Sequence, residues 1–204
     1  MKKYNWLVIA LCLCSLATQA QIRITKGSFV GVGISTFESG YQNGFLPRIN
    51  TGIFAKLTMF DELSLRPEFA YSQRGDLWVK SGSIEEAVMI EYIDFSLLAD
   101  YRVLVHESSG FSVHGMVGPM WSRMFQSSHL QQGIGFTATL TDMYSQTSKI
   151  DFGFLLGGGL AINIGNGSMF VDVRYFLGSR ELTVPPFTTL MQNRMVSFVT
   201  GFEF

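Results

Sequence analysis

The chain is poor in cysteine. It has two among 204 residues, Cys12 and Cys14, and both lie close to the N-terminus. We expect both to leave with a cleaved signal peptide, so that the mature chain has no thiol. Disulfides, thiolate catalysis and cysteine-based metal sites are then excluded. A lipoprotein signal is not expected, because Leu11 and Leu13, and not small residues, precede the two cysteines.

Long hydrophobic runs are missing after the first 20 residues, although 47% of the chain is hydrophobic. A helix needs about 20 apolar residues to cross a bilayer, so no transmembrane helix is predicted. Neither sign of charge is in excess. The formal net charge of -1 gives no indication of nucleic acid, and no nucleic acid partner is expected. Apolar and polar residues instead alternate, as is typical of β-barrel strands.

The first 20 residues have the features of a secretory signal peptide. Lys2 and Lys3 form a basic region, Trp6–Ala17 is apolar, and Ala20 ends a small-residue cleavage site. The apolar stretch is too short to favour the alternative, a membrane anchor. We expect the signal peptide, residues 1–20, to be removed and residues 21–204 to form one outer-membrane β-barrel domain.

Eight segments alternate apolar and polar side chains with a period of two, which predicts β-strands. They are Ser28–Ser35, Arg48–Met59, Leu63–Arg74, Ile90–Val103, Phe111–Phe125, Ile150–Ile164, Ser168–Gly178 and Arg194–Phe204. Single-chain bacterial barrels have an even number of antiparallel strands, and eight is the smallest number. The predicted fold class is all-β, an eight-stranded antiparallel up-and-down transmembrane β-barrel.

The connections between these segments alternate in length. The short ones are Phe60–Glu62, Leu104–Gly110 and Gly165–Gly167; the long ones are Thr36–Pro47, Gly75–Met89, Gln126–Lys149 and Ser179–Asn193. Outer-membrane barrels have short periplasmic turns and longer extracellular loops. The alternation therefore predicts a protein of the cell outer membrane with both termini in the periplasm.

Leu63–Arg74 shows most clearly that each strand has two different faces. Leu65 and Phe69 lie on an apolar face that suits outer-membrane lipid, whereas Arg66 and Glu68 lie on a polar face that suits a lumen. Over all strands, the charged residues on the inward face are Lys56, Arg66, Glu68, Asp94, Asp100, Arg102, Asp151, Asp172 and Arg174, together with Arg74 and Glu203.

These inward charges nearly balance in sign, which predicts that they pair. The interior of an eight-stranded barrel is only wide enough for side chains to fill it. Isolated buried charges are costly, whereas paired and hydrogen-bonded ones are tolerated. We therefore interpret them as a structural lumen charge network. The functional alternative, a narrow ion path or a proton-linked site, has no support in the sequence.

One strand also resembles a known family. Leu63–Gly75 reads Leu-Ser-Leu-Arg-Pro-Glu-Phe-Ala-Tyr-Ser-Gln-Arg-Gly, which resembles the motif Leu-Gln-Pro-Glu-Leu-x-Tyr-Ser-Gln-Lys-Gly of the PorT-like outer-membrane β-barrel family. Further segments that resemble the family are Tyr92–Arg102, Val117–Pro119, Asp151–Gly159 and Asp172–Tyr175. The chain departs from the family at Ser96, where proline is frequent, and at Asp100, where lysine is frequent.

The resemblance spans nearly the whole mature chain and implies an eight-stranded outer-membrane barrel. It implies little about activity, because most members have no assigned function. One namesake belongs to the type IX secretion and gliding machinery. An accessory role in a secretion or surface complex is therefore an analogy from fold.

Ser112 and His114 are the only pair that resembles a catalytic site. They lie two residues apart on one predicted strand and so face the same way, and a barrel hydrolase that trims lipid A also uses a serine and a histidine on one strand. Here the pair is expected to face the lumen near the periplasmic rim, whereas such an enzyme works toward lipid. We expect no enzyme activity; a lipid hydrolase or transferase of the outer membrane is the alternative.

No other motif points to a metal or a cofactor, and none is expected. His106 and His129 lie in a turn and a loop without ligand spacing around them. Gly157–Gly159 is not followed by the Lys-Ser/Thr of a phosphate-binding loop, and it sits within a strand. Small residues there favour bending or the close approach of a bulky lumen side chain.

The long loops are the region left for a specific function. Gln126–Lys149 is rich in Ser, Thr and Gln and is interpreted first as a solvated loop. The alternative is a paired extension of the barrel, whose strand edges would recruit another protein by β-addition. The predicted function is a small non-enzymatic barrel with a filled lumen and a structural or interaction role through these loops.

The predicted barrel also implies partners in the membrane. We expect outer-membrane lipid around the barrel and the barrel-insertion machinery at the C-terminal Phe204. The alternative is a periplasmic barrel that binds an apolar ligand, as lipocalins do. Such a carrier needs apolar residues inside, whereas here the face with Arg66 and Glu68 must be inward for the other face to meet lipid.

Overall fold

Antiparallel strands make up nearly all of the described chain. The computed structural model describes residues 23–37, 43–44, 47–60, 62–80, 84–106, 110–133, 136–182 and 191–204. Its strands are β1 (Arg23–Phe37), β2 (Asn43–Gly44), β3 (Pro47–Thr58), β4 (Leu63–Lys80), β5 (Ile84–His106), β6 (Phe111–Gly133), β7 (Phe136–Asp142), β8 (Ile150–Ile164), β9 (Gly167–Gly178) and β10 (Asn193–Glu203). No helix that could cross a membrane occurs in these ranges. The predicted signal peptide lies outside them.

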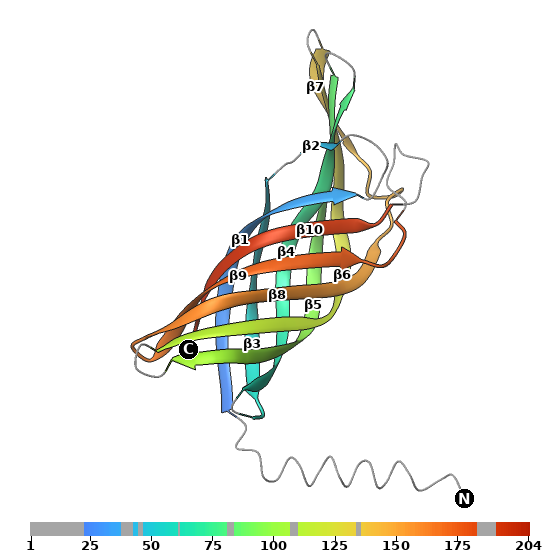
Figure 1. Cartoon of the computed structure of the whole chain (residues 1–204). Helices are drawn as coiled ribbons and strands as arrows, with labels where there is room; N and C mark the ends of the chain where they lie inside the picture. Colours follow the sequence, from blue (N-terminus) through green and yellow to red (C-terminus); the bar gives the residue numbers. More distant parts are fainter. Residues whose placement is uncertain are drawn as a thin grey trace, which may run out of the picture.

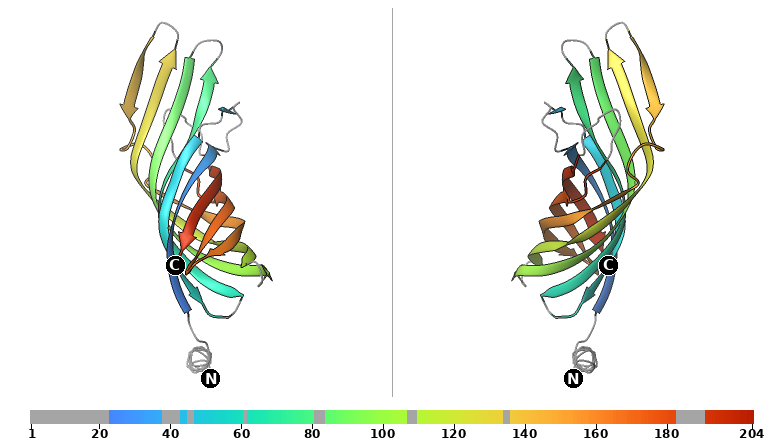
Figure 2. Two further views of the ribbon diagram at one scale, coloured as in Figure 1. Left: turned by 90° about the vertical axis from the view of Figure 1, so that its left-hand side faces the viewer. Right: turned by 90° about the vertical axis from the view of Figure 1, so that its right-hand side faces the viewer.

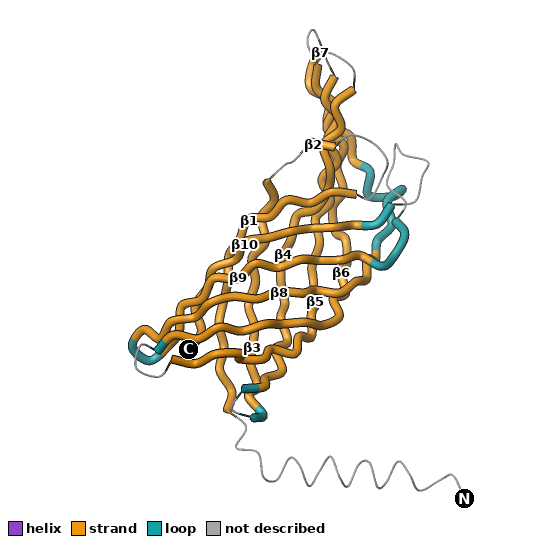
Figure 3. Tube along the Cα trace, viewed as in Figure 1, coloured by secondary structure: helices purple, strands orange, loops and turns teal. Residues whose placement is uncertain are grey.

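Eight of these strands close into an antiparallel barrel (Figure 1, Figure 3). They follow one another around the ring as β4, β3, β1, β10, β9, β8, β6 and β5, and β4 pairs with β5 to complete it. The first and last strands, β1 and β10, lie side by side, with Gly27 opposite Glu203. Each barrel strand therefore neighbours the barrel strands that precede and follow it in the chain. The predicted fold class is confirmed.

The strand bounds agree with the prediction in much of the barrel, but β1 begins earlier, at Arg23, and several strands run on toward one end. β8 covers Ile150–Ile164 as predicted, but β4 and β5 continue through the predicted long loop Gly75–Met89. Their pairing runs from Gly75 opposite Met89 to Lys80 opposite Ile84, so the predicted loop is wrong. Apolar–polar alternation fades where neither face meets lipid, but backbone N–H and C=O groups still need partners. Pairing therefore continues beyond the pattern.

The segment Gln126–Lys149 also contains strands. β6 runs on to Gly133, and β7 pairs with it, with Ser128 opposite Asp142. The interpretation as a solvated loop is wrong for these residues, and the alternative, a paired extension, is confirmed. Figure 2 shows β4, β5, β6 and β7 projecting beyond one end of the barrel.

The two ends of the barrel differ. At one end lie the short turns after β3, β5 and β8, together with the start of β1 and the end of the chain (Figure 1). Gly110 and Gly165, in two of these turns, have φ values of 65° and 60°, a left-handed conformation that glycine adopts without strain. We call this end the terminal end. The opposite end, from which β4 to β7 project, is the distal end.

Side chains along the barrel strands alternate between an apolar outer surface and a buried lumen. In β4, Phe69 is 53% exposed, whereas Glu68 is 3% and Ala70 is 8% exposed. Aromatic rings continue the outer surface across neighbouring strands, since the ring centroids of Phe95 and Trp121 are 6.0 Å apart. Such an outward apolar surface is what contact with lipid requires.

Candidate functional site in the barrel lumen

An ion-pair cluster crosses the lumen between β4 and β9. Glu68 bridges two guanidinium groups, because its Oε1 lies 2.8 Å from Arg66 Nε and its Oε2 lies 2.9 Å from Arg174 Nη1. Asp172 Oδ2 lies 2.8 Å from Arg174 Nη2 and 4.0 Å from Arg66 Nη1. β4 and β9 lie on opposite sides of the ring, with β3, β1 and β10 between them. The cluster therefore ties the two walls of the barrel together.

Aromatic rings hold both arginines of this cluster. Arg66 Cζ lies 3.9 Å from the ring centroid of Phe54 and 5.0 Å from that of Phe170. Arg174 Cζ lies 4.6 Å from the ring centroid of Phe29. A planar guanidinium can stack on a ring while its N–H groups reach carboxylates in its own plane. The rings thus fill the space beside the ion pairs and keep water from it.

Lys56 and His114 extend this cluster toward the terminal end. Lys56 Nζ lies 3.3 Å from Asp100 Oδ2 and 3.8 Å from Glu203 Oε2. Asp100 Oδ2 also lies 3.7 Å from Arg66 Nη1. His114 Nε2 lies 3.1 Å from Asp172 Oδ1. We refer to the following residues as the terminal cluster: Lys56, Arg66, Glu68, Asp100, His114, Asp172 and Arg174.

A second group of polar residues, the distal cluster, is centred on Arg74. Arg74 Nη2 lies 2.7 Å from Asp94 Oδ1, and Nη1 lies 3.3 Å from Asp151 Oδ2. Ser72 Oγ donates a hydrogen bond of 2.6 Å to Asp94, and Asn193 Nδ2 donates one of 2.8 Å to Asp151. Each carboxylate that pairs with Arg74 therefore has a neutral donor as well. Such added hydrogen bonds are what make a buried ion pair tolerable.

Three apolar groups fill the lumen around the two clusters. The first contains Phe29, Phe54, Ala70, Phe170 and Val199; the second contains Leu98, Met116, Met120, Leu155, Phe176 and Met195; the third contains Phe37, Val88, Ile90, Tyr92, Met124, Leu182 and Met191. Along β10 from the terminal end, Val199 of the first group comes before Met195 of the second and Asn193 of the distal cluster. Along β9, Phe170 of the first group precedes Asp172 and Arg174 of the terminal cluster, and Phe176 of the second group follows them, so charged and apolar residues alternate along this wall of the lumen.

Sequence reasoning missed these apolar lumen residues, although the strand pattern contains the signal for them. Phe170 and Phe176 share the face of Asp172 and Arg174 on β9, and all four are buried. Their position on the inward face, next to charged residues, is the signal that assigns them to the lumen.

A short bridge in the connection from β9 to β10 covers the distal end of the lumen. Leu182 N donates to Met191 O at 2.7 Å, and Met191 N donates to Leu182 O at 3.0 Å. The two residues are 0% and 1% exposed and belong to the third apolar group, with Phe37 and Tyr92. Buried apolar side chains thus lie between the distal cluster and the outside.

The structure brings most of the predicted lumen charges together and leaves one apart. Asp94 and Asp151 lie in the distal cluster with Arg74, and Glu203 contacts Lys56. The remaining predicted charges, except one, lie in the terminal cluster. The exception is Arg102, which forms no ion pair with any residue that the structure describes; it is half-buried and borders a cavity at the terminal end.

Ser112 and His114 do not form a nucleophile and its base. His114 is 7% exposed, and its Nε2 faces Asp172. No hydrogen bond joins the two candidate residues, both of which the structure describes. A serine nucleophile needs its base within about 2.6–3.2 Å. The geometry therefore gives no support to a hydrolase.

The other residues considered as metal or phosphate sites, two histidines and Gly157–Gly159, do not form such sites in the described part of the chain. Within the described ranges, no group of three or more His, Asp or Glu side chains is arranged to hold a metal ion. His129 Nε2 lies 3.7 Å from Glu86 Oε2, and the His106 side chain lies outside what the structure describes. A Cβ atom at Gly159 would collide with Asp172 Oδ1 and with the backbone of Val171. A glycine there leaves room for the terminal cluster.

The sequence itself identifies the family. The profile of the family described as outer membrane protein beta-barrel domain matches residues 18–180, most of the chain. The chain belongs to this family. As a family member with a closed eight-stranded barrel, it is a protein of the outer membrane. No curated protein sequence matches it.

Solved structures of other outer-membrane barrels resemble this family member. OprG from Pseudomonas aeruginosa is 14% identical, with 89% of this chain and 94% of that chain covered and a TM-score of 0.50. Neisserial surface protein A (NspA) is 13% identical, with 88% of this chain and 95% of that chain covered and a TM-score of 0.49. At these identities the likeness concerns the fold alone.

Proposed function

We propose that this family member is a non-enzymatic barrel with a filled lumen that presents a strand-built extension to a protein partner outside the cell. The observation that carries the proposal is the extension itself, formed by β4 to β7. β7 pairs with β6, and no other described strand lies beside its second edge. An open strand edge is a template for pairing with another chain.

The extension also has apolar side chains on its surface. Leu140 of β7 is 70% exposed, and Leu130, directly opposite on β6, is 36% exposed. A strand added to the β7 edge would gain backbone hydrogen bonds along its length and could cover this cross-strand pair. We therefore infer that the partner binds by β-addition to β7.

The filled lumen supports a role in presenting the extension to a partner, and it does not support transport through the barrel. Three apolar groups and two ion-pair clusters occupy it, and Leu182 and Met191 cover its distal end. An apolar ligand would have to displace buried arginines from their carboxylates, so the lumen does not suit a carrier of apolar molecules.

The difference between the two ends supports an orientation in the membrane. Short turns and both ends of the described chain gather at the terminal end (Figure 1), which is the periplasmic arrangement typical of outer-membrane barrels. The distal extension then lies outside the cell, lipid surrounds the apolar outer surface, and Phe204 faces the periplasm. Phe204 is there the proposed contact for the barrel-insertion machinery.

The motif Leu63–Gly75 supports a finer placement in the PorT-like group, and with it an accessory role in a secretion or surface complex. In the structure this motif supplies Arg66, Glu68 and Arg74, which lie at the centres of both lumen clusters. The motif thus specifies the lumen and not a binding surface. Family members that share it can therefore differ in their partners, because partner choice would lie in the extension.

Photocrosslinking in intact cells tests the proposed function. A photoreactive residue in place of Leu140 should give a discrete adduct with another protein, because this side chain is exposed on the proposed docking strand. The matched control is Val171 on β9, which is 48% exposed on the outer surface of the barrel and should give no protein adduct. Immunoblotting detects the adduct, and mass spectrometry identifies the partner.

The same cells also test the orientation. Protease added outside should cut within Gln126–Lys149 and spare the turn that contains Glu62 at the terminal end. Cutting of the Glu62 turn alone would show that the barrel is inverted. The absence of any adduct specific to position 140 would contradict the role of the extension.

A further inference from the structure

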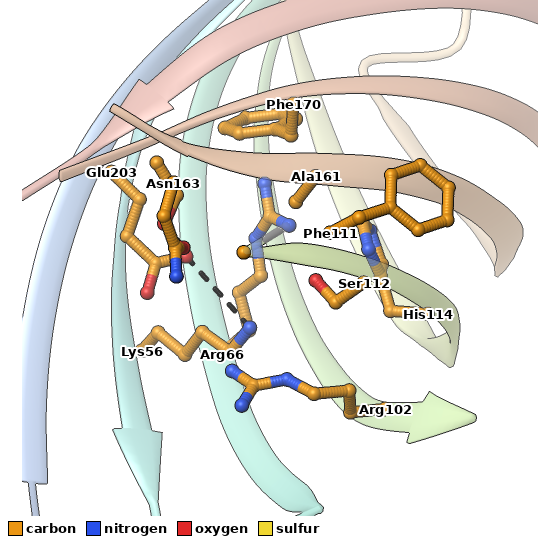
Figure 4. A pocket seen from close by; sticks show the side chains of 12 residues that line it. Lys56, Arg66, Arg102, Phe111, Ser112, His114, Ala161, Asn163, Phe170 and Glu203 are labelled. Carbon is orange, nitrogen blue, oxygen red and sulfur yellow. Dashed lines mark hydrogen bonds and ion pairs between the residues drawn. The ribbon is translucent and has the colours of Figure 1, made fainter. Parts of the chain in front are cut away.

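A cavity of about 290 Å³ lies in the lumen at the terminal end (Figure 4). It is bordered by residues that adjoin the short turns, including Gly110, Asn163 and Ser168. Asn163 is exposed and Ser168 is half-buried, so the cavity can be reached from outside the barrel. It is separate from the β7 extension, which lies at the distal end.

Cationic side chains dominate the walls of this cavity. Lys56, Arg66 and Arg102 line it, against a single lining carboxylate among the described residues, that of Glu203. Arg102 has no ion pair with a described residue. Arg66 is 2% exposed, and its Nη2 is buried without a hydrogen-bond partner in the described part of the chain. Lys56 and Arg66 pair with carboxylates of the terminal cluster. Arg102 therefore brings a charge, and Arg66 a buried N–H group, that no described residue pairs with.

A break in strand pairing sets the position of Arg102. Arg102 is opposite His114 on β6, but the next pair is Leu104 with Val113, so Val103 forms a β-bulge. Bulges occur at the rims of barrels and next to functional sites, where they re-aim a side chain or end the pairing. Figure 4 shows Arg102, from β5, and Lys56, from β3, reaching toward the same space.

Neutral donors complete the cavity wall. Ser168 Oγ donates to Asn163 Oδ1 at 2.8 Å, which fixes the amide and leaves Asn163 Nδ2 to donate to a ligand. Ser112 also lines the cavity with its hydroxyl group. Hydrogen-bond donors from several strands therefore surround the cavity. Those of Lys56 and Arg102 are positively charged, and that of Asn163 is an oriented amide group.

We propose that this cavity binds a phosphate group. A phosphate presents three or four acceptor oxygens, whereas a carboxylate presents two, and Arg102, Lys56 and Asn163 together supply more N–H donors than two oxygens can accept. The Arg102 guanidinium binds two of the phosphate oxygens in its fork. Inorganic phosphate and the phosphate of a lipid headgroup share this chemistry. The proposal is independent of the role assigned to the extension.

Isothermal titration of the refolded chain in an uncharged detergent tests the proposal. Inorganic phosphate should bind saturably, with a dissociation constant of about 1 mM or lower. Arg102→Gln should weaken binding at least tenfold, and Asn163→Ala should weaken it severalfold. Arg123→Gln is the matched control, because Arg123 is exposed and does not line the cavity; its affinity should equal that of the wild type.

Two further titrations define the ligand. Dihexanoyl phosphatidic acid in place of inorganic phosphate distinguishes a lipid source from a free one, and saturable binding of either that depends on Arg102 supports the proposal. Acetate should bind at least tenfold more weakly than phosphate. The proposal is overturned if neither phosphate compound binds, if acetate binds as tightly, or if Arg102→Gln, shown to be folded by heat-modifiable migration, binds like the wild type.

Discussion

Glu68→Ala should lower the free energy of unfolding of the refolded barrel by about 3–5 kcal/mol, the usual loss when one partner of a buried ion pair is removed. Glu68 is 3% exposed and bridges Arg66 and Arg174, which are 2% and 1% exposed. Alanine would remove one of the two carboxylates that these guanidinium groups share, and leave them only Asp172 in common. Urea unfolding in lipid vesicles, followed by tryptophan fluorescence, measures the change.

Two control variants separate the charge from other effects. Glu68→Gln keeps the shape and one acceptor oxygen, so its loss should be smaller than that of Glu68→Ala. Glu62→Ala removes an exposed carboxylate in a turn and should change the free energy of unfolding by no more than about 0.5 kcal/mol. A Glu68→Ala variant as stable as Glu62→Ala would show that the terminal cluster is not a buried ion-pair network.

Phe69→Arg should destabilise the inserted barrel, because it places a charge on the lipid-facing side of β4; the expected loss is about 2–4 kcal/mol for a site near the bilayer midplane. Phe69 is 53% exposed, and its neighbours across the sheet, Ile53 and Phe95, are 61% and 46% exposed. All three therefore belong to one outward apolar surface. Heat-modifiable migration after refolding into vesicles reports how much of the variant inserts.

The adjacent position supplies the control for this substitution. Ala70 faces the lumen opposite Asp94, so Ala70→Ser places a hydroxyl beside a polar residue and should be nearly silent. Phe69→Leu keeps the outer surface apolar and should insert as the wild type does. Equal insertion of Phe69→Arg and Ala70→Ser would mean that the two faces of β4 are assigned the wrong way round.

The period of two along the strands was enough to predict the barrel and the facing of its side chains. Once Arg66 and Glu68 are placed inward, Phe69 must point outward, because a slip of one residue would move every apolar side chain into the lumen. The same rule holds on β9, where Asp172 and Arg174 are buried. Facing is therefore a local property that the sequence contains.

The choice of ion-pair partners could not be predicted in this way. Glu68 and Arg174 are 106 residues apart in the sequence and meet only because β4 and β9 face each other across the ring. Which carboxylate meets which cation depends on the stagger and tilt of the closed barrel, which alternation does not determine. For the same reason the separation of Arg102 from the other lumen charges was not foreseen.

The elements at the distal end could not be predicted from the alternation of apolar and polar residues. β7 and the bridge between Leu182 and Met191 lie where the chain lacks a clear alternation, because their side chains do not divide between lipid and lumen. Their pairing depends on strands from other parts of the barrel, on β6 for β7 and on the third apolar group for Leu182 and Met191. Sequence reasoning could name the extension only as an alternative.

Planar-bilayer recording of the refolded wild-type barrel tests most directly whether side chains close the lumen. Among the described residues, the terminal cluster, the distal cluster and the three apolar groups occupy a lumen that, in a barrel of eight strands, is only wide enough for side chains to fill it. We expect no steady unitary currents from the wild type, and none from Glu68→Ala, in which the apolar groups are retained. Steady unitary currents of porin size from the wild type would show that the lumen is open.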